Sequence, residues 1–317
     1  MSERILVVGE LNVDIILSGM HAFPSLGTEI LADGLHIVMG SSSAICAAGL
    51  ARLGARVDFL GKVGIDYYGD FVIDQLHMLG VGTERVIRDG VIRTGATISL
   101  TYPQDRAMIT YLGCIPHLRL EEINTSILRR YDHLHVGSYF LQRALQPGLP
   151  DLFRRARRAR LTTSLDTGHD PDENWARDEL YKLLELVDIF MPNDEEARAI
   201  AGVDDADAAQ PTETALRELS KFARLVVVKC GPDGAMALQD GQIVHAPGFQ
   251  VEAVDTTGAG DSFGAGFIYA HKVQGMPLNE ALRFANACGA LSATGFGGTA
   301  SQPTATQALS FLKAHPQ

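Results

Sequence analysis

From about residue 121 onward, strand-like and helix-like runs alternate so regularly that few folds remain open to this chain. The expected elements, in chain order, are helix 120–130, strand 133–136, helix 149–160, strand 162–166, helix 174–186, strand 189–191, helix 193–201, helix 212–222 and strand 225–229. Strands joined by helices run parallel and need cover on both faces. The pattern therefore predicts an α/β fold, with a mainly parallel central sheet between two layers of helices.

The two ends of the chain extend this arrangement. The elements expected there are strands 5–9, 57–63, 235–238 and 243–245 and helices 44–53, 70–79, 261–272, 278–293 and 304–314. Segments at about 16–39 and 90–113 differ, because alternating residues around the turn 103–105 are typical of hairpin strands. We expect these segments to form a small β-sheet, a lid or an interface, on a single domain that spans residues 1–317.

Composition limits the classes of partner. The chain has 317 residues, of which 46% are hydrophobic and 21% charged, so it can bury a large core. A formal net charge of -11 argues against nucleic acid or an anionic membrane as a general partner. No apolar run approaches the roughly 18 residues of a membrane span, and the N-terminus lacks the features of a signal peptide. Four scattered cysteines without a CxxC pair fit a reducing compartment, so we expect a cytoplasmic location.

One glycine-rich stretch carries most of the expected chemistry. Gly258, Ala259 and Gly260 form a turn of small residues, whose backbone N–H groups can point at an anion ahead of a helix. The N-terminus of a helix adds positive potential at such a turn. Asp261 follows at its edge, where a carboxylate could take the proton of a hydroxyl that attacks a phosphate. The alternative is a helix start in which Asp261 is only a first-turn cap.

Polar residues near the N-terminus are candidates for binding a second ligand. Asn12 and Asp14 follow the first strand, where open α/β sheets place ligands, and they point the same way if the chain is extended. Gly40, Ser41 and Ser42 open an alanine-rich helix, which is a suitable place for hydroxyl recognition. Each group also has a structural alternative, a strand-end turn for the first and an N-cap for the serines.

Three other patterns have structural explanations that we favour. The arginines between Arg154 and Arg160 fall on the solvent face of a helix with an apolar stripe, rather than in a nucleic-acid site. His133 and His135 alternate along a strand without a third ligand at metal-site spacing, so we interpret them as structural. The glycines from Gly258 on are similar to a dinucleotide fingerprint, but they lie near the C-terminus instead of in a first βαβ unit.

The stretch 255–266, which reads DTTGAGDSFGAG, resembles the C-terminal signature of the PfkB (ribokinase-like) carbohydrate kinases and matches it without a substitution. Segments 12–14, 40–54, 193–196 and 229–234 resemble further family motifs in the family's order. The resemblance covers essentially the whole chain. It implies a ribokinase-like fold with a β lid, and an ATP-dependent carbohydrate kinase that uses magnesium and, as in many members, a potassium-like cation.

The resemblance also implies roles for individual residues. Asp261 would be the general base that activates a substrate hydroxyl, usually a primary CH2OH. The N–H groups of Gly258, Ala259 and Gly260 would stabilise charge on the transferring γ-phosphate. The remaining implied ligands are Asn193 and Glu196 for magnesium and phosphates through water, Lys229, Gly231, Gly234 and Asn286 for ATP, and Asp255, Thr257, Ser292, Gly295 and Gly297 for the potassium-like cation.

The acceptor side departs from the family pattern. Where the family has two consecutive glycines and an asparagine four residues after the second, this chain has Gly40, Ser41 and Ile45. The segment 166–170 also differs from the family's DxNxR. Ribokinase specificity therefore does not carry over, and our hypothesis is that the acceptor is recognised at Gly40 by Asn12, Asp14, Ser41 and Ser42.

We expect a sugar kinase with a homodimer formed through the lid. Two alternatives remain open at this point, a nucleoside kinase of the same fold and a non-catalytic relative that binds a sugar or a nucleotide.

Overall fold

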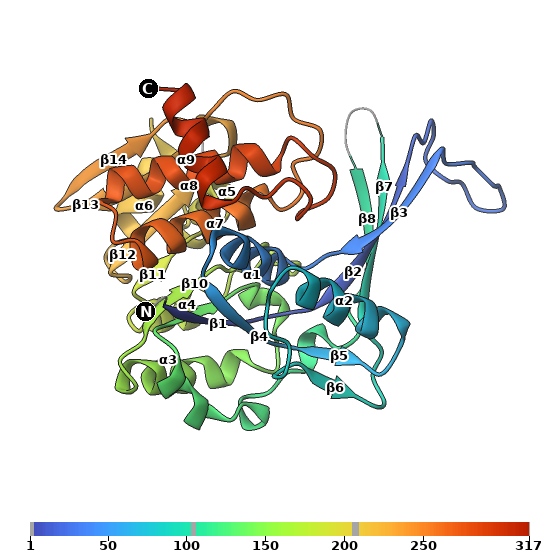
Figure 1. Ribbon diagram of the computed structural model, residues 1–317, viewed down its shortest axis with the longest axis horizontal. Helices are drawn as coiled ribbons and strands as arrows, with labels where there is room; N and C mark the ends of the chain where they lie inside the picture. Colours follow the sequence, from blue (N-terminus) through green and yellow to red (C-terminus); the bar gives the residue numbers. More distant parts are fainter. Residues whose placement is uncertain (1–2, 103–105, 205–208, 317) are drawn as a thin grey trace.

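The computed structural model describes residues 3–102, 106–204 and 209–316, and it has the three layers that the alternation predicts (Figure 1). The strands of its central sheet are β1 (Arg4–Val8), β4 (Arg56–Leu60), β9 (His133–Val136), β10 (Thr162–Leu165), β11 (Ile189–Phe190), β12 (Leu225–Lys229), β13 (Ala235–Gln239) and β14 (Gln242–Ala246). In this described part of the chain they lie in the order β14-β13-β12-β11-β10-β9-β1-β4. The sheet is parallel from β12 to β4, and the hairpin β13–β14 adds an antiparallel edge.

Helices cover both faces of this sheet. One face packs against α1 (Ser42–Leu53), α2 (Tyr67–Met78), α7 (Ala259–Ile268), α8 (Leu278–Ser292) and α9 (Ala305–Ala314), and the other against α3 (Leu149–Arg158), α4 (Arg177–Leu184), α5 (Asp194–Ala201) and α6 (Pro211–Leu219). Strand β1 shows why two cores form. Ile5 and Val7 belong to the first and Leu6 and Val8 to the second, because successive side chains of a strand point to opposite faces. Burying each of these side chains contributes about 1.5–3 kcal/mol.

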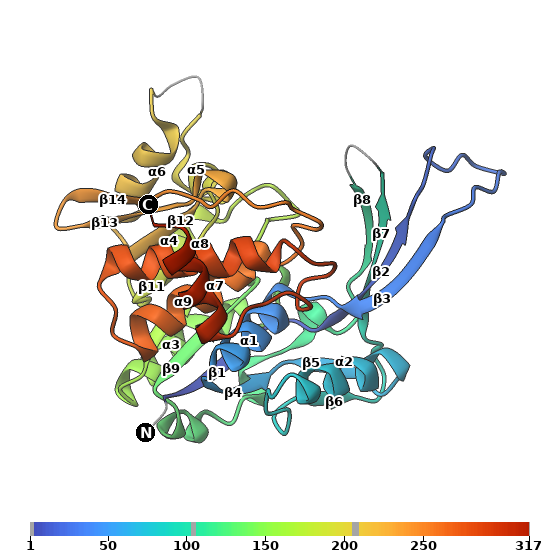
Figure 2. The same ribbon diagram turned by 45° about the horizontal axis from the view of Figure 1, so that its top comes forward.

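A second sheet projects from the body in both views (Figures 1 and 2). Its strands lie in the order β3 (Gly34–Met39), β2 (Asn12–Ser18), β7 (Gly95–Thr101) and β8 (Arg106–Tyr111). The register places Asp14 beside Thr97 on one face and Ile15 beside Ile98 on the other, so the sheet has a polar face and an apolar face. The predicted β lid is thus confirmed, with β2 beginning at Asn12, while the turn predicted at 103–105 lies outside the described residues.

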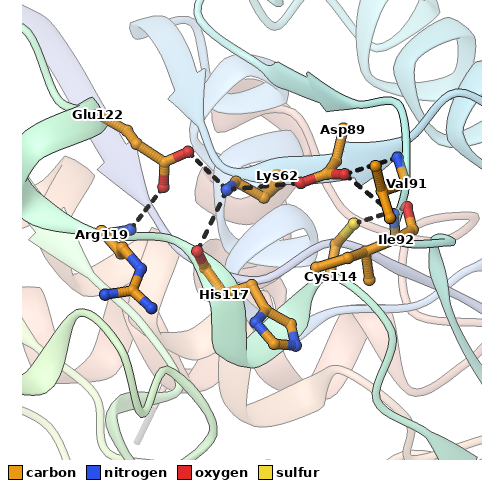
Figure 3. Close-up of polar contacts among 8 residues, drawn as sticks. All are labelled: Lys62, Asp89, Val91, Ile92, Cys114, His117, Arg119 and Glu122. Atoms are coloured by element: carbon orange, nitrogen blue, oxygen red, sulfur yellow. Dashed lines mark hydrogen bonds and ion pairs between the residues drawn. The ribbon is translucent and has the colours of Figure 1, made fainter.

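A buried lysine holds the base of this lid (Figure 3). Lys62 is 7% exposed, and its Nζ donates to Glu122 Oε1 at 2.6 Å and to the His117 carbonyl at 3.2 Å. The same Nζ lies 3.8 Å from Asp89 Oδ2. Asp89 precedes β7 and His117 follows β8, so one ammonium group ties both ends of the β7–β8 hairpin to the body. Lys62 and Asp89 themselves belong to a two-stranded sheet, β5 (Lys62–Gly64) and β6 (Ile87–Asp89).

The helix expected at 261–272 is α-helical only to Ile268 and continues as a π-helix, Tyr269–Val273. Two other expected elements were wrong in kind. The helix expected at 120–130 is two short 3-10 helices, 120–122 and 125–130, because the Glu122 carboxylate turns to Lys62 and to the N–H of Arg119. The strand expected at 57–63 is split at Gly61, where the chain crosses the end of β1 so closely that a Cβ would lie 2.6 Å from the Gly9 carbonyl. No helix in the described ranges is both long and apolar enough to cross a membrane.

Candidate active site

The carboxyl ends of the parallel strands meet the N-termini of α1 and α7 at one edge of the central sheet, the usual position of ligands in open α/β folds. Three charged residues from distant segments come together there. Asp166 follows β10, Lys229 ends β12, and Asp261 lies in the first turn of α7. Asp166 and Asp261 line one small cavity. The glycine turn and Asp261 therefore lie at the edge of the sheet where the polar residues that follow its strands come together.

The small-residue turn before α7 has the geometry of an anion site. Gly258 has a φ of 72°, and a Cβ there would lie 2.9 Å from both Ile45 Cγ2 and the Gly298 Cα, so only glycine fits. The N–H of Ala259 donates to the Thr256 carbonyl at 3.2 Å, which turns the chain into the helix. Gly260 and Asp261 lie in the first helical turn, whose N–H groups have no carbonyl partner within the helix. These N–H groups are therefore available to phosphate oxygens.

Electrostatics around Asp261 favour a carboxylate that titrates near neutrality. Burial, followed by the repulsion of Asp166, raises the pKa of Asp261 to about 7, although Lys229 opposes the shift. Lys229 Nζ and Asp166 Oδ2 are 2.5 Å apart, and both side chains are nearly buried. Burial alone would lower the pKa of Lys229, but Asp166 and Glu196 raise it above the usual value. A permanent cation thus stands beside Asp261, on the side where phosphate charge is expected.

A cavity of about 510 Å³ adjoins the turn, in a place suited to a nucleotide. Its wall includes all four residues predicted for ATP, Lys229, Gly231, Gly234 and Asn286, together with Ala259 and Gly260. The Asn286 amide donates to the carbonyls of Ala246 and Pro247 at 2.9 and 3.0 Å, so it holds a wall segment in position. The sequence did not reveal the apolar part of the wall, which includes Phe249, Val251, Phe263, Ala290 and Ala293. Single apolar residues from five positions carry no local motif.

Asn193 and Glu196 lie at the N-terminus of α5 as a capping box. Asn193 Oδ1 accepts the Glu196 N–H at 2.7 Å, and Glu196 Oε2 accepts the Asn193 N–H at 2.9 Å. Burial raises the pKa of Glu196 to about 7, against the attraction of Lys229. No three acidic, His or Cys side chains of the described ranges form a metal cage. A magnesium ion held by one carboxylate, water and phosphates fits this arrangement, because Mg²⁺ in phosphate sites keeps several waters.

On the acceptor side, the structure brings Asn12, Asp14 and Gly40 together. Asn12 Nδ2 donates to Asp14 Oδ1 at 2.9 Å, and the Gly40 N–H donates to the Asn12 carbonyl at 3.0 Å. A Cβ at Gly40 would lie 2.7 Å from Asn12 Nδ2, so glycine leaves room for the two polar side chains. Asn12 and Asp14 also share the polar face of the lid sheet, so these candidate acceptor ligands belong to the lid itself.

The two serines after Gly40 differ. Ser41 has a φ of 73°, and its hydroxyl donates to the Glu10 carbonyl at 2.6 Å and accepts the Ala44 N–H at 2.9 Å. The Ser41 side chain is therefore the N-cap of α1, whereas Ser42 is exposed and lines the small cavity beside Asp261. Glu10, which sequence reasoning passed over, is 3% exposed and accepts the N–H and the hydroxyl of Ser43.

Ile45 explains one departure from the family pattern. Its side chain is 3% exposed and packs against the backbone of Gly258 and Gly298. A hydrocarbon side chain there cannot bind substrate hydroxyls, but its contact with Gly258 supports the glycine turn before α7. The nearby Gln302 amide donates to the Ile45 carbonyl and to the Ser262 hydroxyl at 2.9 and 3.0 Å, which ties α1 to α7.

The residues implied for a potassium-like cation gather around one loop pair. The Asp255 carboxylate accepts the N–H groups of Thr257 and Gly297, each at 2.9 Å, and so joins two distant segments. The Ser292 hydroxyl donates to the Gly289 carbonyl at 2.8 Å within α8. Gly295 lies so close to Ser301 that a Cβ would collide with its side chain. The Asp255 contacts therefore hold the two loops next to each other. Backbone carbonyls of these loops would be the main ligands of a cation.

Comparison with known proteins agrees with this geometry. Residues 2–305 match the model of the pfkB family carbohydrate kinases. A ribokinase of Haemophilus influenzae is 28% identical over 314 residues, which cover 99% of each chain. An ATP-dependent ribose-1-phosphate kinase of Halopiger xanaduensis is 32% identical, over 98% of each chain.

A solved structure gives the same result for the fold. An E. coli protein described as a ribokinase II, in complex with ATP and Mg²⁺, superposes with a TM-score of 0.85 at 25% identity, over 99% of this chain and 100% of that chain. The family match extends over almost the whole sequence and includes the strand ends and glycine turns described above. The chain thus belongs to the pfkB family and is an ATP-dependent carbohydrate kinase.

Proposed function

We propose that this kinase transfers the γ-phosphoryl group of ATP to a primary hydroxyl of a sugar, with Asp261 as the general base. The observation that carries the proposal is the position of Asp261. It lies between the N–H groups of the glycine turn, the Lys229 ammonium and the cavity that Ser42 lines, and its pKa is raised to about 7. A base is most effective when its pKa lies near the working pH.

In this proposal each part of the site has one task. Asp261 accepts the proton of the acceptor hydroxyl as its oxygen forms a bond to the γ-phosphorus and the bond to ADP breaks. Gly258 and Gly260 present backbone N–H groups to the equatorial phosphate oxygens, and Ala259 does so once its N–H leaves the Thr256 carbonyl. Lys229 offsets the charge of these oxygens. Asn193 and Glu196 would hold magnesium through water, and the ion would supply further charge neutralisation.

The remaining assignments place ligands around this centre. ATP occupies the cavity lined by Gly231, Gly234 and Asn286. The loops joined by Asp255 bind the potassium-like cation with Thr257, Ser292, Gly295 and Gly297. Asn12, Asp14, Gly40 and Ser42 contact the acceptor, while Ser41 acts through the backbone because its hydroxyl caps α1.

A panel of acceptors in an ADP-release assay, with and without potassium, tests the substrate class. The panel should contain ribose, ribose 1-phosphate, fructose and 5-dehydro-2-deoxygluconate, because relatives of this chain are named as kinases of these compounds. The Asp261→Asn variant is expected to lose about 10²–10⁴-fold in kcat. Turnover undiminished in that variant, or absent with every sugar, rejects the proposal.

One observation keeps a nucleoside kinase as the second candidate. The rings of His36 on the lid and Phe296 in the loop after α8 lie 4.5 Å apart. An aromatic pair at the edge of an acceptor site can stack on a nucleobase. Nucleosides therefore belong in the same panel, and a preference for them over every sugar would select this second candidate.

We also propose that two chains pair through the apolar face of the lid. The exposed apolar side chains of this face are Leu35, Ile37, Ile98, Ile109 and Tyr111, which lie in facing rows. Ile109 is 62% exposed and Leu35 61% exposed, although such residues are usually buried. A second copy would cover them without touching the polar face, which faces the acceptor site.

A further inference from the structure

A chain of buried polar side chains runs beneath α7, along the side of the sheet that faces this helix. His133 and His135 of β9 and Thr162 and Ser164 of β10 point to this side, because residues two apart in a strand share a face. Ser164 Oγ lies 2.8 Å from His135 Nδ1 and 2.8 Å from His133 Nε2. His133 Nδ1 in turn lies 2.7 Å from Thr162 Oγ1. Both imidazoles are essentially inaccessible, at 0% and 2% exposure.

The His135 end of this chain reaches the catalytic centre. His135, Asp166, Asp261 and Ser42 line a cavity of about 10 Å³, together with Cys46, Gly137 and Gly264. That volume is about what one water molecule requires, provided that it finds two to four polar partners. The described residues provide no hydrogen-bond partner for His135 Nε2, and the two carboxylates are acceptors. The cavity can therefore satisfy three hydrogen bonds of a single water.

The single hydroxyl proton of Ser164 restricts the tautomers of both histidines. Ser164 can donate to only one imidazole, so it must accept an N–H from the other. If it donates to His135 Nδ1, the His135 proton is on Nε2 and faces Asp166 and Asp261. The opposite arrangement would turn an imidazole lone pair toward two carboxylates, which is electrostatically unfavourable. The Thr162–His133 contact of 2.7 Å serves both arrangements, with Thr162 donating in the first and accepting in the second. In the second arrangement the Thr162 hydroxyl proton is left with the longer contact of 3.4 Å to the Asp132 carbonyl, which also favours the first.

We propose that His135 is a positioning residue for phosphoryl transfer, whose Nε2–H donates to one water in this cavity while that water donates to the carboxylates of Asp261 and Asp166. The inference rests on the proposed role of Asp261 as base. The water-mediated contact holds the Asp261 carboxylate in one orientation and stabilises its ionised form. Ser164, His133 and Thr162 keep the His135 proton on the nitrogen that faces the cavity.

The charges around Asp261 explain why a hydrogen-bond donor such as His135 Nε2–H matters there. Burial is the largest cause of the raised pKa of Asp261, the carboxylates of Asp166, Glu10 and Glu196 raise it further, and Lys229 is the cation that lowers it. Burial lowers the pKa of His135 to about 4, so at neutral pH the imidazole is uncharged and acts through its N–H dipole. Cys46 from α1 faces the same cavity with its thiol protonated, because burial raises its pKa. His133 is also neutral, since burial, His135 and Lys272 all lower its pKa.

The test compares His135→Phe, which has no donor, with His135→Gln, whose amide can place an N–H near the position of Nε2. The Asp261 carboxyl is titrated by ¹³C NMR in each protein and assigned with Asp261→Asn. We expect the pKa of Asp261 to rise by about one pH unit in His135→Phe and to stay within about 0.3 in His135→Gln. In the wild type, ¹⁵N spectra should show the His135 proton on Nε2.

Thr163→Val is the matched control. Thr163 is buried in the same strand as Ser164 but points to the opposite face, where it bonds to Asp188. It should lose stability without moving the Asp261 titration. A proton on Nδ1 of His135, an unchanged pKa in a folded His135→Phe protein, or an equal shift in Thr163→Val overturns the inference. If no acceptor is phosphorylated, the proposed function fails, but the carboxyl titration still decides the role of His135.

Discussion

Asp261 combines two properties that oppose each other at the scale of the residue. Its place in the first turn of α7 gives it the positive end of a helix dipole, yet burial and the neighbouring Asp166 make its ionised form unfavourable. Lys229 cannot fully compensate, because its charge is already paired with Asp166 at 2.5 Å. A carboxylate in this balance gains a proton easily, as a general base must.

The first expected outcome is a pH dependence of the rate. Asp261 must be ionised to accept a proton, and its pKa is raised to about 7. The kcat should therefore fall about tenfold for each pH unit below about 7 and level off above it. Initial rates of ADP release between about pH 5.5 and 9 measure this. A rate that stays constant down to pH 5.5 would show that the base is a different group.

The second outcome concerns stability. The pKa of Asp261 is higher in the folded protein than in the unfolded chain, so the folded state binds more protons between about pH 4 and 7. The free energy of unfolding should therefore fall as the pH rises through this range. Asp261→Asn removes that penalty, which is about 1.4 kcal/mol for each of roughly three pKa units, and should stabilise the protein by up to about 4 kcal/mol at pH 8, but hardly at all at pH 4. Denaturant unfolding at both pH values measures the difference, and equal effects would contradict the raised pKa.

At the scale of the element, the base of the lid is held by the contacts of a single buried lysine, Lys62. Lys62 lies in β5, and its Nζ contacts Asp89 of β6 and two acceptors from the turns after β8, the His117 carbonyl and the Glu122 carboxylate (Figure 3). Asp89 is further fixed by the N–H groups of Ile92 and Val91, which lower its pKa. The β7–β8 half of the lid is thus fixed to the body, whereas the β2–β3 half begins at Asn12 and ends just before Gly40, two of the proposed acceptor ligands.

The third outcome follows from this joint. Lys62→Met keeps the side-chain volume but leaves Asp89 and Glu122 without their cation, so it should destabilise the protein by about 3 kcal/mol. Because the lid root loosens, KM for the acceptor should rise while KM for ATP stays nearly constant. The control is Lys221→Met, which breaks an exposed pair with Glu218 and should cost less than about 1 kcal/mol. Equal changes in both KM values would argue against a role confined to the lid.

At the scale of the whole molecule, the exposed face of the lid predicts association. An extended row of large apolar side chains in water is unfavourable and often marks an interface. The fourth outcome is that the wild-type protein sediments as a dimer and that Ile109→Asp converts it to a monomer. Met108→Asp is the matched control, because Met108 is 59% exposed on the same strand but belongs to the opposite face. A monomeric wild type, or equal effects of both substitutions, would exclude the lid as the interface.

Much of the fold follows from local pattern. The strands β9, β10 and β12 and the helices α1 and α8 lie within two residues of their expected bounds, because apolar periodicity and capping residues act over a few positions. The expected helix at 120–130 failed where a distant partner intervened, since Lys62 is 60 residues away from Glu122. In the same way, the split at Gly61 results from the crossing of β1 and not from anything in 57–63 itself.

The sequence by itself determined the layered α/β fold, the glycine turn and the position of Asp261 after it, since each depends on residues that are adjacent in the chain. Only the tertiary structure decided what surrounds Asp261. The ion pair of Lys229 with Asp166 spans 63 residues, and His135 reaches the cavity from a third strand. The tertiary structure also makes Ser41 a helix cap and turns Ser42 toward the cavity, although both are serines at neighbouring positions. Charge, burial and hydrogen bonding depend on distance in space, which a sequence does not contain.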